Sequence, residues 1–318
     1  MTHVPAYVVV SPCRDEADYM EITLESMVNQ TWRPAQWVIV DDGSTDATPD
    51  ILKRYQAEHP WIKIVTRQNR GHRAVGPGVV DAFWAGHAEI DLEDYDYVVK
   101  LDLDLDMALD YFETVLGRME ADPRYGTCSG LPYVPVEGGE PVPEGANWDV
   151  SAGMTKIYRT ACFEQIGGIR RGVMWDGIDC HLARMNGWKV IAWDDTPSLR
   201  FLHLRAMGSS QKSIWTGRQR HGSGQAFMGT SWWYMGVSVA FRMLKRPYLL
   251  GGALMYWGYL KFRLSGQPRF DHPGFRRFLR RYHWAILTKG RQGALEWIEA
   301  EYAGKFEPDR RAKLPLDG

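Results

Sequence analysis

Short apolar runs alternate with amphipathic stretches through the first third of the chain. The runs at residues 7–10, 37–40 and 62–65 are rich in β-branched and aromatic residues, and each ends at polar or turn-forming residues, as buried strands do. Between them, residues 18–30 and 47–58 place apolar side chains at helical spacing. This alternation predicts an α/β fold, with a Rossmann-like mixed sheet flanked by helices.

The same pattern continues to about residue 205. A strand is predicted over residues 95–99, helices over 110–120 and 175–186, and further strands over 125–133 and 153–159. Residues 136–147 are rich in Gly, Pro and Glu, so they are expected to form a surface loop that acts as a mobile lid. We therefore expect one α/β domain over residues 1–210.

The last third has a different pattern. Residues 232–241 and 248–262 are apolar and rich in aromatic residues, and the basic residues Arg242, Lys245 and Arg246 separate them. Both stretches are shorter than the roughly 20 residues that cross a bilayer. They predict a helical region over residues 211–318 that either lies in the lipid headgroup layer or packs on the first domain with a solvated basic face.

Charge is divided unevenly along the chain. The net charge of the 318 residues is −1, yet residues 200–291 hold seventeen basic residues against one acid, Asp271, so this segment carries +16 and the remainder −17. Such an asymmetry indicates a surface that meets anions, either phospholipid headgroups or nucleic acid. No zinc-finger, RNP or helix-turn-helix pattern accompanies it, so nucleic acid is not expected as a partner.

The cysteines and the first residues bear on localisation. Four cysteines stand far apart without a C-x-x-C pair, which favours reduced thiols. Residues 1–5 lead almost directly into the first predicted strand, without the basic and apolar segments of a signal peptide. We expect a cytoplasmic protein, peripheral on the cytoplasmic face of the membrane if the basic region binds lipid.

Candidate chemistry lies where the predicted strands end. Lys100, Asp102 and Asp104 follow the strand over residues 95–99, and two carboxylates two positions apart lie on one face of an extended chain. Ligands of open α/β sheets bind beyond the carboxyl ends of the strands. Such carboxylates suit Mn²⁺ or Mg²⁺ and the phosphates of a nucleotide, although solvated carboxylates at a strand end would give the same pattern.

A second acidic turn follows the strand over residues 37–40. Capping of the next helix explains Ser44, Thr45 and Asp46, but it does not explain the adjacent pair Asp41 and Asp42. Pro12, Arg14 and Glu16 follow the first strand at the same predicted edge, and we include them among the candidates for binding the nucleotide.

These two acidic motifs together carry a family resemblance. Asp41-Asp42-Gly43-Ser44-Thr45-Asp46 after a strand, and Asp102-Leu103-Asp104 after a later one, closely resemble the signatures of family 2 glycosyltransferases with the GT-A fold. The resemblance covers roughly residues 6–205. It implies that Asp41 or Asp42 holds the base of a nucleotide, that Asp102 meets the ribose or the metal, and that Asp104 binds the metal.

The resemblance also implies a catalytic base. The family usually has Glu-Asp at the start of a helix where this chain has Trp175-Asp176, and Asp179 lies one helical turn further on. Asp176 is the preferred base and Asp179 the alternative, while either could instead cap the helix. A His shortly after this helix can complete the metal shell in the family, which implies that role for His203, although a lone His is more often a core residue.

A basic loop lies between the two motifs. Residues 67–73 contain Arg67, Arg70, Gly71 and Arg73 and precede a helix predicted through residues 79–83. A helix amino terminus with nearby Arg suits a diphosphate, so Arg73 is a donor-binding candidate, with a solvated surface Arg as the plain alternative. The polar residues 217–224 are expected to close over the same diphosphate.

The resemblance implies an inverting, metal-dependent glycosyltransferase. The donor would be a UDP-, GDP- or dTDP-linked sugar, and the acceptor a saccharide or a polyprenyl-linked saccharide of a cell-surface or exopolysaccharide pathway. Two other classes have a basis in the sequence. A metal-dependent nucleotidyltransferase shares the sheet and the acidic residues but normally has a Gly-rich basic loop after its first strand, where this chain has residues 13–17. A non-catalytic anion- or nucleic-acid-binding protein would use the basic segment.

Overall fold

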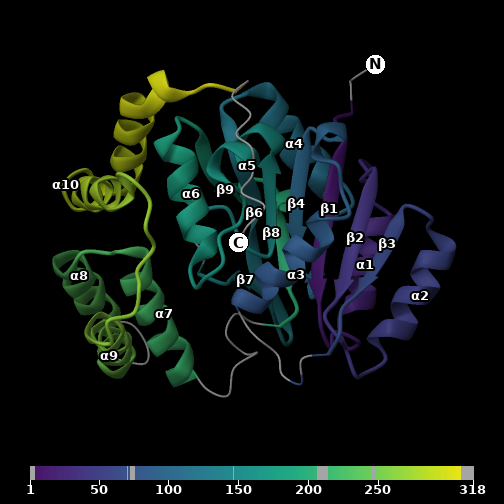
Figure 1. Ribbon diagram of the computed structural model, residues 1–318, viewed down its shortest axis with the longest axis horizontal. Helices are drawn as coiled ribbons and strands as arrows, with labels where there is room; N and C mark the ends of the chain where they lie inside the picture. The colour runs from purple at the N-terminus through teal and green to yellow at the C-terminus, as the bar shows by residue number, and fades with distance from the viewer. Residues whose placement is uncertain are drawn as a thin grey trace.

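A sheet of ten strands organises the part of the chain that the computed structural model describes, which is residues 4–69, 71, 76–145, 147–205, 214–244 and 248–308. The strand order is β3-β2-β1-β4-β8-β6-β10-β5, and β7 and β9 both pair with β6. Figure 1 shows β3, β2, β1 and β4 side by side, with α2 beyond β3 and the helices α7–α10 on the far side of α6.

The strands are β1 Tyr7–Cys13, β2 Gln36–Asp41, β3 Ile62–Thr66, β4 Tyr97–Leu101, β5 Leu105–Asp106, β6 Tyr125–Val136, β7 Gly139–Pro143, β8 Thr155–Arg159, β9 Lys189–Trp193 and β10 Arg200–His203. The helices are α1 Met20–Val28, α2 Thr48–Glu58, α3 Pro77–His87, α4 Tyr111–Ala121, α5 Thr160–Ile166, α6 Trp175–Met185, α7 Ile214–Met228, α8 Trp232–Met243, α9 Leu250–Leu264 and α10 Phe275–Tyr302. Short 3₁₀ turns lie at Leu92–Asp94, Pro197–Leu199 and Ala303–Lys305.

Strand pairing brings the ends of three strands together. β1 runs parallel to β2, with Cys13 opposite Asp41, and parallel to β4, with Val10 opposite Lys100. β8 is antiparallel to β4 and places Thr155 opposite Leu101. The loops after β1, β2 and β4 and the loop before β8 therefore leave the sheet at one edge.

Alternating side chains along the strands cover both faces of the sheet with helices. Val8 and Val10 face one core, which α3, α5 and α6 complete, whereas Tyr7 and Val9 face the other, which α1, α2 and α4 complete. This two-sided burial explains why the first strands are continuous apolar runs, and it confirms the α/β prediction.

The expected loop over residues 136–147 is wrong in part, because it contains a strand. β6 continues to Val136, a turn at Glu137 and Gly138 follows, and β7 returns antiparallel to β6. Gly138 has a φ of +68°, a conformation that glycine adopts without strain, so the turn that suggested a loop closes a hairpin.

Helices α7, α8 and α9 form a small core of their own. Ala226, Met235, Val239, Met255 and Tyr259 fill it. α7 and α9 approach so closely that a Cβ atom at Gly222 would lie 1.8 Å from the carbonyl oxygen of Met255. Residues 217–224, the polar segment expected to close over the diphosphate, lie within α7 and so are part of a packed helix.

The helical region also shares a core with the sheet domain. Phe275 and Leu279 of α10 and Met228 of α7 lie in the same buried cluster as Ile178 of α6. Gly290, with a φ of 71° and a ψ of 175°, breaks α10 into two segments. Among the described residues, no helix has both the length and the apolar character to cross a bilayer.

Candidate active site

The acidic turn after β2 is rigid and mostly buried. The Oδ1 atom of Asp41 accepts a hydrogen bond from the backbone N–H of Ser44 at 2.9 Å. The Oδ1 atom of Asp42 lies 2.9 Å from Nη1 of Arg67, and Nη1 of Arg14 donates to the carbonyl oxygen of Asp42 at 3.0 Å. The two carboxylates are thus fixed in place at the sheet edge.

Short polar side chains tie this turn to the loop after β1. The backbone N–H of Asp15 donates to Ser44 Oγ at 2.9 Å, and that of Glu16 donates to Thr48 Oγ1 at 2.9 Å. Asp46 accepts from the backbone N–H of Thr48 at 3.0 Å, although the residue at the N-cap of α2 is Ala47. The Ser, Thr and Asp of the motif therefore join two loops and also shape the start of α2.

The first Asp after β4 faces a lysine. Nζ of Lys100 lies 2.5 Å from Oδ1 of Asp102 and donates to the carbonyl oxygen of Gly153 at 2.9 Å. A Cβ atom at Gly153 would lie 3.2 Å from Oδ2 of Asp176. Lys100 thus links the end of β4 to the segment before β8, against which Asp176 packs.

The second Asp lies in a charged cluster. Oδ2 of Asp104 is 3.1 Å from Nε of Arg205 and 3.6 Å from Nε2 of His203. Arg205 also pairs with Glu16 from the loop after β1, while Nδ1 of His203 lies 2.8 Å from Oε2 of Glu144, just beyond β7. The loop after β1, the stretch after β4 and the end of β10 therefore meet at Asp104.

The protonation states in this cluster follow from its charges. Burial by itself would lower the pKa of His203, but its bonds to Asp104 and Glu144 raise that pKa to about 9. Burial would raise the pKa of Asp104, whereas His203 and Arg205 hold it below its usual value. Asp104 is therefore a carboxylate and His203 an imidazolium at neutral pH.

We tested whether these residues fit a divalent cation. Within the described ranges, no three His, Cys, Asp or Glu side chains are grouped as a metal centre, and Asp102 turns to Lys100. Oδ1 of Asp104 is nevertheless buried and has no hydrogen-bond partner among the described residues. A carboxylate with one unpartnered oxygen, and with an imidazole 3.6 Å from its other oxygen, fits Mn²⁺ or Mg²⁺ through two protein ligands, Asp104 and His203, once His203 has lost its proton.

The two candidates for the base have different surroundings. Asp179 is fully buried: its Oδ1 atom lies 2.5 Å from Nζ of Lys156, and its other oxygen accepts from the hydroxyl of Tyr158. Burial would lower the pKa of Lys156, and the charge of Asp179 outweighs that effect and raises it, so the lysine is charged. Asp179 thus belongs to a sealed ion pair and does not face a cleft.

Asp176 is only partly buried, and no hydrogen bond or ion pair reaches its carboxylate from the described residues. Burial lowers the pKa of His221, on α7, to about 4, and the charge of Asp176 opposes that shift, so α7 passes close to Asp176. The helix start at Met174 has no side-chain cap, so neither Asp176 nor Asp179 caps α6.

The aromatic residue beside Asp176 contacts two lysines. The ring of Trp175 lies 5.5 Å from Nζ of Lys100 and 5.5 Å from Nζ of Lys156. Trp175 stands where the related family usually has a carboxylate. In this chain its ring lies beside Lys100, the partner of Asp102, and beside Lys156, the partner of the buried Asp179.

Most of the residues chosen from the sequence lie at this edge, including Pro12 near the end of β1. Arg73 and Arg70 lie outside the described residues. Sequence reasoning assigned no role to Arg205, Glu144 or Lys156. Arg205 could have been noted because it follows His203 by two positions. No local pattern marked Glu144, whose partner His203 lies 59 positions away, or Lys156, whose partner Asp179 lies 23 positions away.

Comparison with known proteins gives a family. A sequence profile described as Glycosyl transferase family 2 matches residues 8–173, which is more than half of the chain. The poly-beta-1,6-N-acetyl-D-glucosamine synthase of Staphylococcus aureus strain MSSA476 is 26% identical over 123 residues, or 38% of this chain and 27% of the synthase. The matched part is thus about a quarter of that relative's length.

Solved structures give the fold. The mannosyltransferase PcManGT from Pyrobaculum calidifontis, in complex with GDP-Man and Mn²⁺, has a TM-score of 0.53 at 17% identity, over 95% of this chain and 88% of that one. GalNAc-T7 with UDP, GalNAc and Mn²⁺ has a TM-score of 0.55 at 13% identity, over 92% of this chain and 59% of that one. The chain therefore has the GT-A fold.

Proposed function

The chain belongs to glycosyl transferase family 2, and on that premise we propose that it transfers a sugar from a nucleoside diphosphate donor to an acceptor hydroxyl, with inversion at the anomeric carbon. The observation that supports this proposal best is the state of Asp104. Its Oδ2 atom lies near both Arg205 and His203, while its Oδ1 atom is buried and has no hydrogen-bond partner among the described residues. The profile match gives no support to a nucleotidyltransferase or to a nucleic-acid-binding protein.

The donor binds along the edge where β1, β2 and β4 end. Asp41 and Asp42, already oriented by Ser44 and Arg67, accept hydrogen bonds from the base. Arg14 lies beside Asp42, and Asp102 faces the ribose. Pro12 and Glu16 line the same edge, and Arg73 of the loop before α3 contacts the diphosphate.

Asp104 and His203 hold Mn²⁺ or Mg²⁺. PcManGT and GalNAc-T7 were solved with Mn²⁺ and a nucleotide or nucleotide sugar, which supports this cofactor class. When bound, the cation stabilises the negative charge of the leaving nucleoside diphosphate as a Lewis acid. Lys100 contributes positive charge at the end of β4, where it also keeps Asp102 and Gly153 in place.

Asp176 takes the proton of the acceptor hydroxyl. Its carboxylate is partly exposed and has no partner among the described residues, unlike that of Asp179. A positioned general base contributes about 10²- to 10⁴-fold to such a step. The hydroxyl oxygen attacks the anomeric carbon from the face opposite the leaving group, so a single displacement inverts the stereochemistry.

The acceptor is a saccharide, free or linked to a polyprenyl chain, at the cytoplasmic surface of a membrane. Support for this part comes from the basic, aromatic-rich helices α8–α10 and from the similarity to a polysaccharide synthase. Eleven large hydrophobic side chains between residues 232 and 287 are exposed, which is typical of helices at a lipid interface.

Calorimetry with UDP-, GDP- and dTDP-linked sugars, with and without Mn²⁺, tests the proposal. We expect cation-dependent binding of one donor class, lost in Asp104→Asn and retained in the control Asp106→Asn, whose carboxylate is assigned no role. Equal donor affinity with and without Mn²⁺, or an Asp104→Asn protein with the wild-type affinity for the donor, would overturn it.

A further inference from the structure

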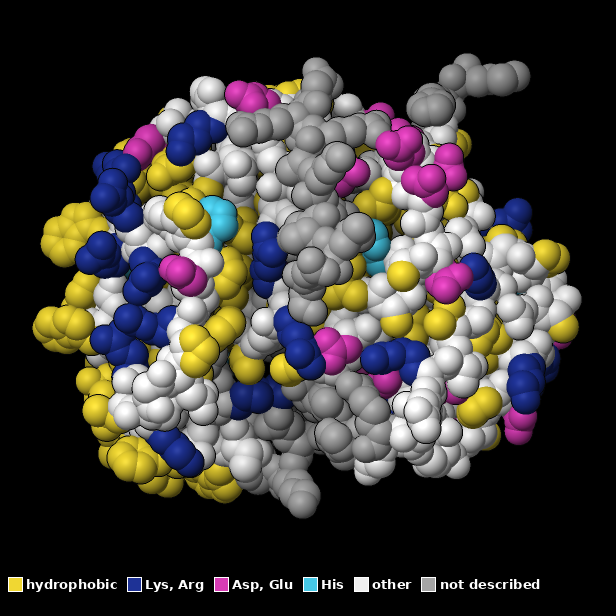
Figure 2. All heavy atoms as spheres, viewed as in Figure 1, with side chains coloured by type: hydrophobic (Ala, Val, Ile, Leu, Met, Phe, Trp, Pro, Cys, Tyr) yellow, Lys and Arg dark blue, Asp and Glu magenta, His cyan; other side chains and the backbone are white. Residues whose placement is uncertain are grey.

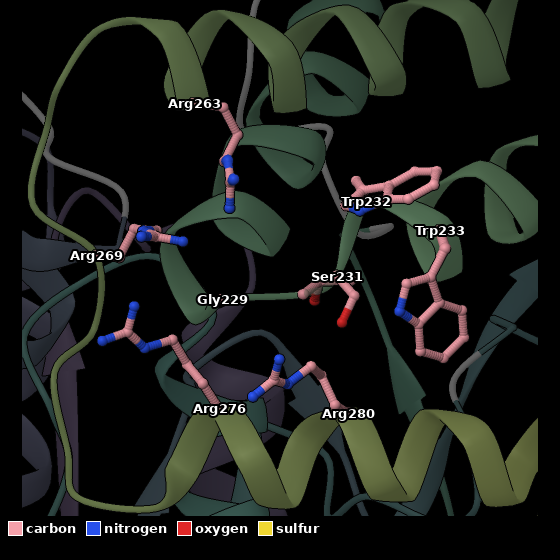
Figure 3. A pocket seen from close by; sticks show the side chains of 9 residues that line it. Gly229, Ser231, Trp232, Trp233, Arg263, Arg269, Arg276 and Arg280 are labelled. Carbon is pink, nitrogen blue, oxygen red and sulfur yellow. The ribbon is translucent and has the colours of Figure 1, made fainter.

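Four arginine side chains surround one cavity in the helical region. Arg263 lies near the end of α9, Arg269 in the connection to α10, and Arg276 and Arg280 on the first turns of α10. Residues 229–233 also line the cavity, whose volume is about 450 Å³. Figure 3 shows the guanidinium groups reaching into this space from two helices and a loop.

The charges of these arginines are poorly balanced by the protein. Arg276 lies 3.6 Å from Asp271, whose side chain is 90% exposed, and this contact is too long and too solvated to neutralise the cluster. Among the described residues, no ion pair involves Arg263, Arg269 or Arg280. Cations gathered around one cavity repel one another, so binding of an anion there lowers the free energy of the protein.

Residues 229–233, which also line the cavity, supply a neutral hydrogen-bond donor. The hydroxyl of Ser231 is buried and has no hydrogen-bond partner among the described residues. Ser231 is the N-cap of the twelve-residue helix α8, and its side chain makes no capping bond to the first amides of that helix. Gly229 has a φ of +95°, and a Cβ atom there would lie 2.9 Å from Cγ of Arg276. The wall is therefore shaped to admit the arginine.

Exposed apolar side chains line this cavity or lie next to residues that line it, since Leu264 follows Arg263 and Trp284 contacts Trp233. Trp232 is 71% exposed, Leu264 83% and Trp284 63%, and the ring of Trp284 meets that of Trp233 edge to face at 6.1 Å. Figure 2 shows basic and hydrophobic side chains gathered together over this side of the molecule. A soluble anion would contact the arginines alone, whereas a membrane lipid would present its phosphate to the arginines and its acyl chains to the apolar side chains.

We propose that the cavity binds the phosphate or diphosphate headgroup of a membrane lipid, while Trp232, Leu264 and Trp284 enter the apolar layer beneath it. The guanidinium forks hold the phosphate oxygens in pairs, and Ser231 donates a further hydrogen bond. A volume of 450 Å³ leaves room for more than one phosphate. This site deepens the membrane association proposed above, but its binding does not require glycosyl transfer.

Vesicle flotation of the full chain in metal-free buffer tests the site. The vesicles are phosphatidylcholine alone or with phosphatidic acid, and inorganic pyrophosphate is the soluble competitor. The variant is Arg269→Gln with Arg280→Gln. The control is Lys261→Gln with Lys289→Gln, which removes the same charge from exposed positions of the same region. Circular dichroism checks that both proteins are folded.

We expect the wild type and the control to bind the phosphatidic acid vesicles, and pyrophosphate to displace both proteins from them. The arginine variant should bind these vesicles at least about tenfold more weakly than the wild type. Equal losses in variant and control would overturn the site, because any surface charge would then suffice. If calorimetry detects binding of pyrophosphate to the wild type but the vesicles do not bind it, the lipid assignment is overturned. Donor binding in the calorimetric assay is expected to be unchanged in the arginine variant, which separates this proposal from the catalytic one.

Discussion

Nζ of Lys156 lies 2.5 Å from Oδ1 of Asp179, and both side chains are fully buried between β8 and α6. Three positions earlier on the same helix, the carboxylate of Asp176 is partly exposed and has no partner among the described residues. The sequence ranked Asp176 ahead of Asp179 as the base, and the surroundings of the two carboxylates differ. Lys156 neutralises Asp179 inside the protein, whereas Asp176 has no described partner, which supports the proposed role of Asp176 as the base.

This difference predicts opposite phenotypes for two isosteric substitutions. Asp176→Asn should lower the turnover of donor and acceptor by about 10²- to 10⁴-fold, because the general base is removed. It should leave the free energy of unfolding nearly unchanged, since no described bond to that carboxylate is lost. Steady-state kinetics and urea denaturation measure the two quantities.

Asp179→Asn should show the reverse. Removal of one member of a buried ion pair leaves Lys156 charged and uncompensated, which costs about 3–5 kcal/mol of unfolding free energy. Donor turnover by the fraction that remains folded should fall much less than in Asp176→Asn. A stable Asp179→Asn protein with no turnover, beside an active Asp176→Asn protein, would reverse the assignment of the base.

The bond between Glu144 and His203 predicts an effect on cation affinity. Glu144 accepts from Nδ1 of His203 at 2.8 Å, and this orients Nε2 toward Asp104. Loss of such an outer partner typically weakens metal binding by about 10- to 100-fold. Glu144→Gln also lowers the pKa of His203, so the comparison is made at a pH where the imidazole is neutral in both proteins. There it should raise the Mn²⁺ concentration needed for half-maximal donor binding by about tenfold or more. Glu140→Gln, exposed on β7, is the matched control and should leave that concentration unchanged.

A third prediction concerns how α10 is held on the sheet domain. Oδ1 of Asp149 lies 2.5 Å from Nη1 of Arg291, and Oδ2 accepts from the hydroxyl of Tyr282 at 2.9 Å. Because Asp149 is buried, Asp149→Asn should cost about 1.5–3 kcal/mol of unfolding free energy, the typical value of hydrogen bonds to charged groups. Chemical denaturation measures it.

The matched control for that prediction is a surface pair on the same helix. Nη1 of Arg281 lies 2.6 Å from Oε1 of Glu301, and the two side chains are 46% and 30% exposed. Glu301→Gln should therefore cost less than about 1 kcal/mol. Equal costs for the two substitutions would show that burial of Asp149 does not set the strength of its contacts.

The strand ends could be located from sequence because local chemistry marks them. An apolar run followed directly by Asp41 and Asp42, or by Asp102 and Asp104, predicts a buried strand and the loop after it, and β2 and β4 end within a residue of those positions. Parallel pairing then places both loops at one edge without further information. The α/β class and the two acidic loops of the candidate site follow from these patterns.

Contacts between distant segments could not be predicted in the same way. Glu144, Lys156 and Arg205 gain their importance from partners on other strands and helices, and their neighbours in the chain carry no special pattern. Strand β7 was missed because its residues are exposed and include Gly and Pro, so it has no buried face to produce alternation. The arginine cavity likewise exists only once α8, α9 and α10 have packed.

Two buried histidines, one on α6 and one on α10, predict how stability depends on pH. Burial, reinforced by the charges of Arg184 and Lys156, lowers the pKa of His181 to about 3, and burial holds that of His283 well below its usual value. Both remain neutral in the folded protein and take up a proton on unfolding below their unfolded pKa of about 6.5. The unfolded state therefore binds more protons between pH 6.5 and about 3, and stability falls as the pH decreases through that window.

Each such histidine should remove about 1.4 kcal/mol per pH unit within the window, since one proton is taken up. Urea denaturation at pH 7.5, 6.5 and 5.5 measures this slope. His181 packs among Phe275, Phe278 and Tyr282, so His181→Phe should keep the packing and reduce the uptake by about one proton. The control Phe278→Leu should lower stability by a similar amount at every pH, because it removes packing but no titrating group. A pH slope that His181→Phe leaves unchanged would mean that the imidazole does not stay neutral in the folded protein.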